Sequence, residues 1–195
     1  MQIVLASTSP ARQRLLTQCH VLCNVASPKA EEVFLPTDPP KKTVLRLARL
    51  KAQSVAVDYP NTLIIGADQL AYCDQQLWGK PHSLHHAIAM LQKLSGHRLR
   101  FYTAFALLNT KTGQIHQYCE TTDVVLRNLT LSRINYYLKQ EPSALNCAGA
   151  IKAEGLGALL IRSIHPKKDP NALIGLPILT LFDYLEKAGW SILDT

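Results

Sequence analysis

The hydrophobic positions of this chain form short apolar runs that alternate with longer amphipathic stretches. The runs at residues 2–6 and 62–67 are typical of buried strands, and residues 98–108 and 114–126 form two long β-like segments around a hairpin. Helices are predicted at residues 10–16, 41–58, 83–94 and 130–139 and after Pro177, whereas residues 27–40 and 141–157 read as loops. This alternation predicts an α/β fold with a mixed sheet flanked by helices.

One lysine falls on the apolar side of the predicted helix at residues 41–58. A step of about 100° per residue places Lys51 on the same arc as Val44 and Leu47, whereas Arg49 faces the opposite side. An inward ammonium group is costly unless an anion pairs with it or a cleft exposes it, so Lys51 is a candidate ligand-binding residue. The alternative is a lysine at the edge of the stripe that extends its head group into water.

Two places in the pattern suit an anionic ligand. The predicted strand at 62–67 delivers Asp68 at its carboxyl end, which is where open α/β sheets bind ligands. Ser7, Ser9 and Arg12 lie on a strand-to-helix turn, where backbone N–H groups and the helix dipole favour an anion. The alternative for this turn is a helix that is simply well capped.

Length and composition limit the classes to which the protein can belong. A chain of 195 residues suits one domain, taken here as residues 1–195, which can be built from two lobes around a cleft. Hydrophobic residues at 47% and charged residues at 18% are ordinary globular values. No apolar run approaches the roughly 18 to 20 residues that span a bilayer, so no membrane partner is expected. The first residues show no secretory pattern, and we expect a cytoplasmic protein.

The cysteines and the net charge add two further expectations. The five cysteines are scattered and contain no CxxC pair, so they are predicted to be buried thiols in a reducing compartment. A zinc site at Cys19, His20 and Cys23, or at the histidines between residues 82 and 86, would lack a fourth ligand at a local spacing. The net charge of +7 favours polyanionic partners such as nucleic acid, acidic lipid or phosphorylated metabolites.

Six short motifs are more specific when they are considered together, although the usual glycine-rich phosphate loops are absent. In chain order they are LASTSPARQRLL at 5–16, GADQ at 66–69, GKP at 79–81, SGH at 95–97, CAGAIKAEGLG at 147–157 and GLP at 175–177. With these motifs the chain resembles the Maf family of nucleotide pyrophosphatases over nearly its whole length. The resemblance implies a two-lobed fold with a central nucleotide cleft.

The resemblance also implies roles for individual residues. Asp68 would be the catalytic acceptor of a proton from water, and it would hold a divalent metal, Mg²⁺ or Mn²⁺, together with Glu32. The family's phosphate-binding positions correspond to Arg12, Lys51 and Lys80, with Ser7 and Ser9 as polar turn residues. The anion beside Lys51 would then be the triphosphate of the substrate.

Base preference within the family is indicated by Gln69 and Glu154. GADQ and IKAEGLG match the branch that acts on 7-methyl-GTP, whereas the dTTP and UTP branch typically shows GADT and YGIQGxG. A carboxylate at Glu154 can accept both the N1–H and the N2 amino group of guanine, whereas uracil and thymine offer one such donor. Ala11 departs from the large side chain that is usual at this position, which can change base affinity or selectivity.

The predicted reaction is hydrolysis of a nucleoside triphosphate to the monophosphate and pyrophosphate, and the expected substrate is 7-methyl-GTP. The alternatives are the same reaction on dTTP, UTP or another non-standard nucleotide, and a basic RNA-binding protein without enzymatic activity. The latter explains the positive charge but not Asp68 and Glu32 among cations. We expect no stable nucleic-acid partner, and a homodimer is compatible with the sequence.

Overall fold

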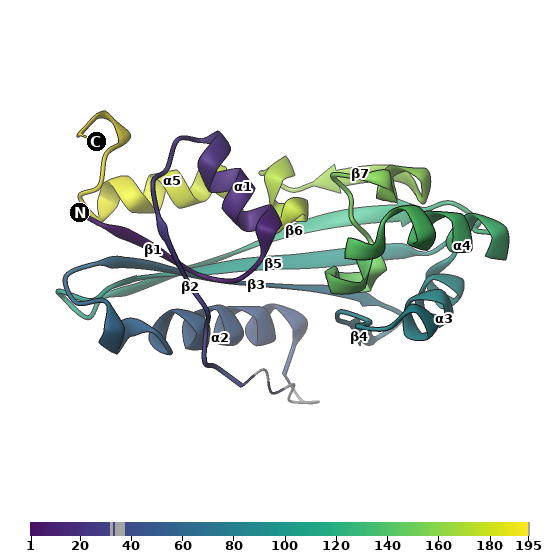
Figure 1. Ribbon diagram of the computed structural model, residues 1–195, viewed down its shortest axis with the longest axis horizontal. Coiled ribbons are helices and arrows are strands. Elements are labelled where there is room, and N and C mark those ends of the chain that lie inside the picture. Colours follow the sequence, from purple (N-terminus) through teal and green to yellow (C-terminus); the bar gives the residue numbers. More distant parts are fainter. Residues whose placement is uncertain (32, 34–37, 195) are drawn as a thin grey trace. The chain divides into compact units, whose positions relative to one another are not determined.

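The computed structural model describes residues 1–31, 33 and 38–194 (Figure 1). The strands in these residues are β1 (Ile3–Ala6), β2 (Asn24–Ala26), β3 (Leu63–Cys73), β4 (Gln76–Trp78), β5 (Arg98–Asn109), β6 (Ile115–Leu126) and β7 (Ile161–Pro166). The α-helices in the same residues are α1 (Pro10–Gln18), α2 (Pro40–Gln53), α3 (Leu84–Leu94), α4 (Leu131–Gln140) and α5 (Ile178–Lys187).

The strands form one mixed sheet in the order β2-β1-β3-β5-β6-β7, and β4 pairs with β3. β1 is parallel to both of its neighbours, β2 and β3. The β3–β4 and β6–β7 pairs are antiparallel. The predicted α/β fold with a mixed sheet is therefore confirmed.

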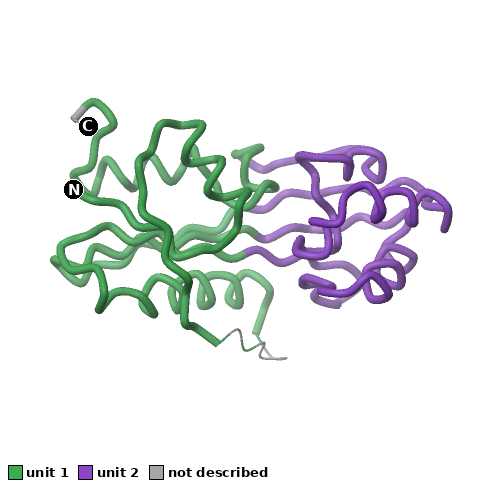
Figure 2. The backbone as a smooth tube through the Cα atoms, viewed as in Figure 1, with its two compact units in different colours: residues 1–68, 103–120, 168–195 green, residues 69–102, 121–167 purple. Residues whose placement is uncertain are grey.

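The chain divides into two compact units, which Figure 2 shows in different colours. Unit 1 consists of Met1–Asp68, Thr103–Glu120 and Lys168–Thr195, and unit 2 consists of Gln69–Tyr102 and Thr121–Lys167. Strands β3, β5 and β6 contribute residues to both units. Two units agree with the two-lobed fold that the family resemblance implies, whereas the nucleotide cleft stays a prediction.

Unit 1 buries both faces of its part of the sheet. Helices α1 and α5 cover one face and α2 covers the other (Figure 1). All four residues of β1 are buried, which explains why the strand is a continuous apolar run rather than an alternating one. Ile3 and Leu5 pack in a core cluster with Leu15 and Leu16 of α1 and with Leu181 of α5.

Unit 2 is organised by a pair of packed helices. Helix α3 contacts α4 and the short 3-10 turn at Ala148–Ala150. Ser83 and Thr130 cap the N-termini of these two helices through their side-chain oxygens. Both helices begin and end within two residues of the predicted bounds, because the capping residues are readable in the sequence.

The second predicted helix is shorter than expected. It ends at Gln53 rather than at residue 58, and a separate 3-10 turn follows at Ala56–Asp58. The hydroxyl of Ser54 donates a hydrogen bond of 2.9 Å to the carbonyl of Lys51 and accepts one from the backbone N–H of Lys29. Serine competes for backbone groups in this way and so favours a helix end.

The cysteine prediction is wrong for four of the five residues. All five are free thiols, but only Cys73 is buried, and Cys19, Cys23, Cys119 and Cys147 are half-buried. Burial raises the pKa of the Cys73 thiol to about 11, which keeps it in the unreactive protonated form at neutral pH. Cys19 and Cys147 are partly exposed because they lie at the ends of helical elements.

No helix in the described part of the chain is long and apolar enough to cross a bilayer.

Candidate active site

The turn between β1 and α1 is built around two serine hydroxyls. Ser9 has an extended backbone and is the N-cap of α1, and its side chain accepts from the N–H of Arg12 at 3.5 Å. Ser7 is 4% exposed, and its hydroxyl accepts from the N–H of Ser9 at 3.2 Å. Pro10 then begins the helix, where its missing N–H costs nothing. The N-cap at Ser9 is therefore confirmed, whereas an anion bound at this turn stays a prediction.

Arg12 is fixed by three acceptors from separate segments of unit 1. Its Nη1 donates to the hydroxyl of Ser7 at 3.1 Å and to the carbonyl of Ala67 at 3.0 Å, and its Nε donates to the carbonyl of Gly175 at 2.8 Å. The planar guanidinium has five N–H donors in a rigid arrangement, which allows one side chain to join three segments. Arg12 therefore ties the first turn of α1 to β3 beside Asp68.

Gly175 is shaped for this contact. Its φ of +132° lies in a region that favours glycine, and a Cβ at this position would come within 3.3 Å of Arg12 Nε. The GLP motif at residues 175–177 thus has a structural reason: it presents a carbonyl to Arg12 without a side chain in the way.

The inward lysine of α2 meets a carboxylate. Lys51 and Asp68 are each 5% exposed, and Lys51 Nζ lies 2.6 Å from Asp68 Oδ1. The prediction that Lys51 lies on the buried face of the helix is confirmed. The anion beside it is Asp68, because α2 packs directly against β3.

Gly66 allows this close approach of helix and strand. A Cβ on Gly66 would meet the carbonyl oxygen of Ala48 at 2.1 Å and the amide nitrogen of Ala52 at 2.6 Å, both of them backbone atoms of α2. Only glycine leaves room for the helix at this distance. The glycine of the GADQ motif therefore positions Lys51 against Asp68, which is two residues further along β3.

Asp68 does not lie at the end of its strand, contrary to the sequence prediction. β3 continues to Cys73, because its last residues pair with β4 from Ala71 onwards. The parallel partner β1 stops earlier, at the Ala6–Gly66 pair. Asp68 is thus two residues beyond the end of the parallel β1–β3 ladder, a position equivalent to the strand end at which open α/β sheets bind ligands.

The other predicted residues lie elsewhere in the chain. Ala11 is half-buried on α1, in unit 1. Gln69, Lys80 and Glu154 belong to unit 2, where Gln69 is half-buried on β3 and the other two are exposed. Glu32 lies outside the described residues. The structure therefore gathers Ser7, Ser9, Arg12, Lys51 and Asp68 in unit 1, whereas a joint role of Gln69 and Glu154 stays a prediction.

Lys80 follows a turn that is held by backbone hydrogen bonds within unit 2. The carbonyl of Gly79 accepts from Gly149 N–H at 3.0 Å, and His82 N–H donates to the carbonyl of Leu145 at 3.1 Å. The GKP motif is thus attached on both sides to the region that leads into the CAGAIKAEGLG motif. Two motifs that are distant in sequence form one local structure here.

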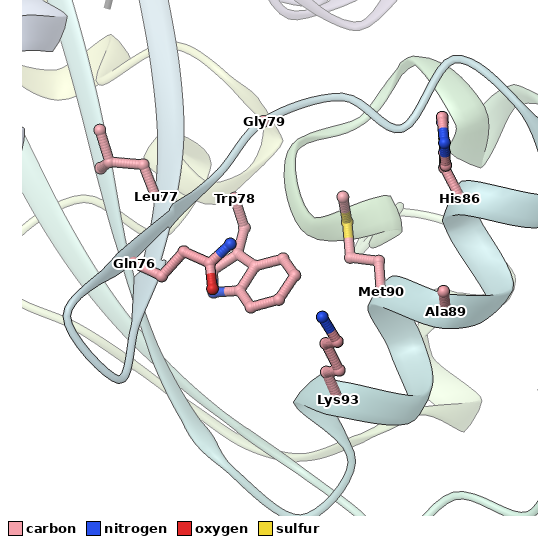
Figure 3. Close-up of a pocket in the computed structure, with 8 residues that line it drawn as sticks. All are labelled: Gln76, Leu77, Trp78, Gly79, His86, Ala89, Met90 and Lys93. Atoms are coloured by element: carbon pink, nitrogen blue, oxygen red, sulfur yellow. The ribbon is translucent and has the colours of Figure 1, made fainter. Parts of the chain in front are cut away.

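A cavity in unit 2 is lined by none of the residues that were predicted to bind substrate or metal in the active site. It has a volume of about 270 Å³ and lies between β4 and α3 (Figure 3). Its lining residues are Gln76, Leu77, Trp78, Gly79, His86, Ala89, Met90 and Lys93. This volume is below the roughly 300 to 1,000 Å³ of typical ligand pockets, so we do not place the substrate there.

Sequence reasoning missed the residues that position the others. Gly66 and Gly175 were part of recognised motifs, but their roles depend on α2 and Arg12 being close, which no local pattern reveals. Glu141 and Tyr137, which hold the segment that carries Glu154, were not singled out. The glycines of that segment were the available signal, because they indicate a loop with an unusual backbone conformation. Such a loop needs side chains from other elements to hold it in place.

The fold, the site and the comparison with known proteins together define the class and the family of this chain. The fold and the site place the chain among open-sheet α/β proteins, which bind ligands near the carboxyl ends of parallel strands. Within that class the chain belongs to the Maf family, because the family profile described as Maf-like protein matches residues 2–188.

Several relatives are similar over nearly their whole length. A protein of Neisseria gonorrhoeae named 7-methyl-GTP pyrophosphatase is 44% identical over 193 residues, which cover 99% of this chain and 98% of the relative. Proteins of the same name from Aliivibrio fischeri and Nitrosococcus oceani are 42% and 40% identical. Their alignments each cover 98% of this chain, and 98% and 95% of the respective relative.

Proposed function

We propose that this protein hydrolyses 7-methyl-GTP to 7-methyl-GMP and pyrophosphate. The observation that carries the reaction is the buried carboxylate of Asp68, which Lys51 contacts at 2.6 Å beside a turn stiffened by Arg12. The names of relatives that are 40–44% identical over the full chain support the choice of substrate.

In the proposed reaction Asp68 accepts the proton of an attacking water. The water oxygen forms a new bond to the α phosphorus. The bond between the α phosphorus and the oxygen that bridges to the β phosphate breaks, and pyrophosphate leaves with the electron pair. Lys51 holds the carboxylate in one orientation, so little reorganisation is needed when the proton moves.

The phosphates require cationic and polar partners. Arg12 and Lys51 supply positive charge in unit 1, Ser7 and Ser9 belong to a turn at a helix N-terminus, and Lys80 is an exposed cation in unit 2. The hydrogen bonds of Arg12 to three protein acceptors favour a role in shaping the turn as well as in charge stabilisation. We assign these five residues to phosphate binding.

A divalent cation fits the residues that are present. Mg²⁺ typically binds through one or two carboxylates and substrate phosphates and retains several waters, so it does not require a cage of protein ligands. Among the described residues, no group of three or more His, Cys, Asp or Glu side chains could hold a metal by itself. Asp68 would hold Mg²⁺ or Mn²⁺, with Glu32 as the second carboxylate. When bound, the cation screens the phosphate charge and lowers the pKa of water.

Base selection is assigned to Glu154 and Gln69, with Ala11 as a modifying position. Glu154 is exposed on a segment of unit 2 that is fixed on both sides, and a carboxylate can accept the two adjacent donors of guanine. The positive charge of the methylated ring favours a carboxylate further. We place the activity in the cytoplasm, without a stable nucleic-acid partner, and a homodimer is compatible with it.

The test is turnover of 7-methyl-GTP, GTP, dTTP and UTP by purified Asp68→Asn, with detection of pyrophosphate. We expect a loss of about 10²- to 10⁴-fold, as for removal of a general base. Asp74→Asn is the matched control, because Asp74 is an exposed residue of the β3–β4 turn whose positive φ of 49° suits asparagine. Near-normal turnover in Asp68→Asn, or activity that persists in EDTA, would contradict the mechanism. RNA binding without pyrophosphate release would support the non-enzymatic alternative.

A further inference from the structure

The segment that carries Glu154 is held by the end of helix α4. Tyr137 is fully buried, its hydroxyl donates to the carbonyl of Ala150 at 3.0 Å, and the same oxygen accepts from the backbone N–H of Lys152 at 3.0 Å. One phenol group therefore fixes the backbone just before Glu154. The oxygen is satisfied as both donor and acceptor, as a buried hydroxyl requires.

Glu141 fixes the same segment on both sides of Glu154. Its Oε1 accepts from Lys152 Nζ at 2.8 Å and from the Ser143 hydroxyl at 2.6 Å, while its Oε2 accepts from the backbone N–H of Leu156 at 3.5 Å. The side chains of Glu141 and Lys152 are only 17% and 19% exposed. Lys152 precedes Glu154 by two residues and Leu156 follows it by two. The Glu141 carboxylate therefore holds the chain on both sides of Glu154, the residue assigned to base recognition.

The glycines of the segment are required by this arrangement. A Cβ on Gly155 would meet Glu141 Oε2 at 2.5 Å, and a Cβ on Gly157 would meet the carbonyl oxygen of Lys152 at 2.3 Å. The backbone N–H groups of both glycines donate to that same carbonyl at 3.1 Å. The turn is therefore closed around Lys152 and packed against Glu141, which leaves Glu154 exposed at its tip.

From these contacts we infer that Glu141 is a positioning residue for base selection. It holds Glu154 in the orientation in which its two oxygens face the two donors of guanine, and it does so through Lys152 and Leu156 without touching the substrate. The inference rests on the proposed role of Glu154. A carboxylate that must accept two hydrogen bonds at once depends on its orientation, because a misplacement of about 1 Å can cost 10²-fold in rate.

The experiment compares kcat/KM for 7-methyl-GTP and for UTP in Glu141→Gln, Glu141→Ala, Glu154→Gln and the double variant Glu141→Gln/Glu154→Gln. We expect Glu141→Gln to lower the ratio of the two kcat/KM values by about tenfold or more, since one acceptor oxygen becomes an NH2 donor that opposes either the N–H of Leu156 or the ammonium group of Lys152. The double variant should show the ratio of Glu154→Gln alone, because Glu141 acts through Glu154. Gln140→Ala, an exposed neighbouring change, should leave the ratio unaltered.

Two failures are distinguishable. If Glu154→Gln lowers the ratio but Glu141→Gln lowers both kcat/KM values equally, Glu141 is only structural and the inference is overturned while the proposed function stands. If Glu154→Gln leaves the ratio unchanged, the assignment of the base to Glu154 fails and the inference fails with it. Glu141→Gln keeps the shape of the side chain, so the comparison remains valid even where Glu141→Ala does not fold.

Discussion

Lys51→Met tests whether the Lys51–Asp68 pair is part of the folded protein itself. From the helical pattern alone, methionine should suit the apolar arc and leave the free protein stable. The structure leads to the opposite expectation, because Asp68 is 5% exposed and lies 2.6 Å from the ammonium group. Removing Lys51 leaves a carboxylate that remains buried after its cationic partner is gone.

The magnitude follows from this burial. Removing one partner of a buried ion pair costs about 3 to 5 kcal/mol, which corresponds to a fall of roughly 6 to 20 °C in Tm for a chain of this size. The double variant Lys51→Met/Asp68→Asn carries neither charge and should recover much of the loss. The coupling between the two sites would then be far from additive, as expected for side chains in direct contact.

The assay is thermal and urea unfolding of the free protein, without nucleotide or metal. Arg49→Met is the matched control, because Arg49 is exposed on the same helix and its loss should change stability by less than about 0.5 kcal/mol. A Tm for Lys51→Met within about 1 °C of the wild type would refute the reasoning. A double variant that loses the sum of the two single losses would refute it as well.

Three further predictions concern stability and the site. Gly66→Ala should lower the free energy of unfolding in urea by about 1 to 3 kcal/mol, because the added Cβ meets the backbone of α2. Gly79→Ala is the control, because a Cβ at that position has no atom within 4 Å. Equal effects of the two variants would contradict the close packing of α2 on β3. Gly175→Ala should raise KM more than Gly189→Ala does, because both glycines have a positive φ but only Gly175 contacts Arg12. Similar KM values for the two variants would show that the contact with Arg12 does not contribute to substrate binding. The hydrogen bond from Lys152 holds the pKa of Glu141 below its ordinary value of 4.5, so Glu141 stabilises the fold above that pH, and the stabilisation is lost as the pH falls through the lowered pKa. The Tm difference between wild type and Glu141→Gln should therefore be constant near neutral pH and narrow progressively as the pH falls below about 4.5, and a difference that widens as the pH falls below 4.5 would contradict this.

The sequence by itself determined the elements that depend on local pattern. The strands at β1 and β5, the capped starts of α1, α3 and α4, and the inward position of Lys51 follow from spacing and from capping residues. These features are predictable because each depends on neighbours within a few residues. The family was also recognisable, since its short motifs occur in order along the chain.

The tertiary structure decided the partners of these residues. β3 extends past Asp68 because β4 folds back to pair with it, and β4 is too short to be read from periodicity. Lys51 and Asp68 are 17 residues apart, and Arg12 and Gly175 are 163 residues apart. Such contacts depend on how helices and strands pack, and a pattern with a period of two or 3.6 residues contains no information about them. The types of side chain in the candidate site can therefore be read from the sequence. Their geometry depends on the close packing that Gly66 and Gly175 permit.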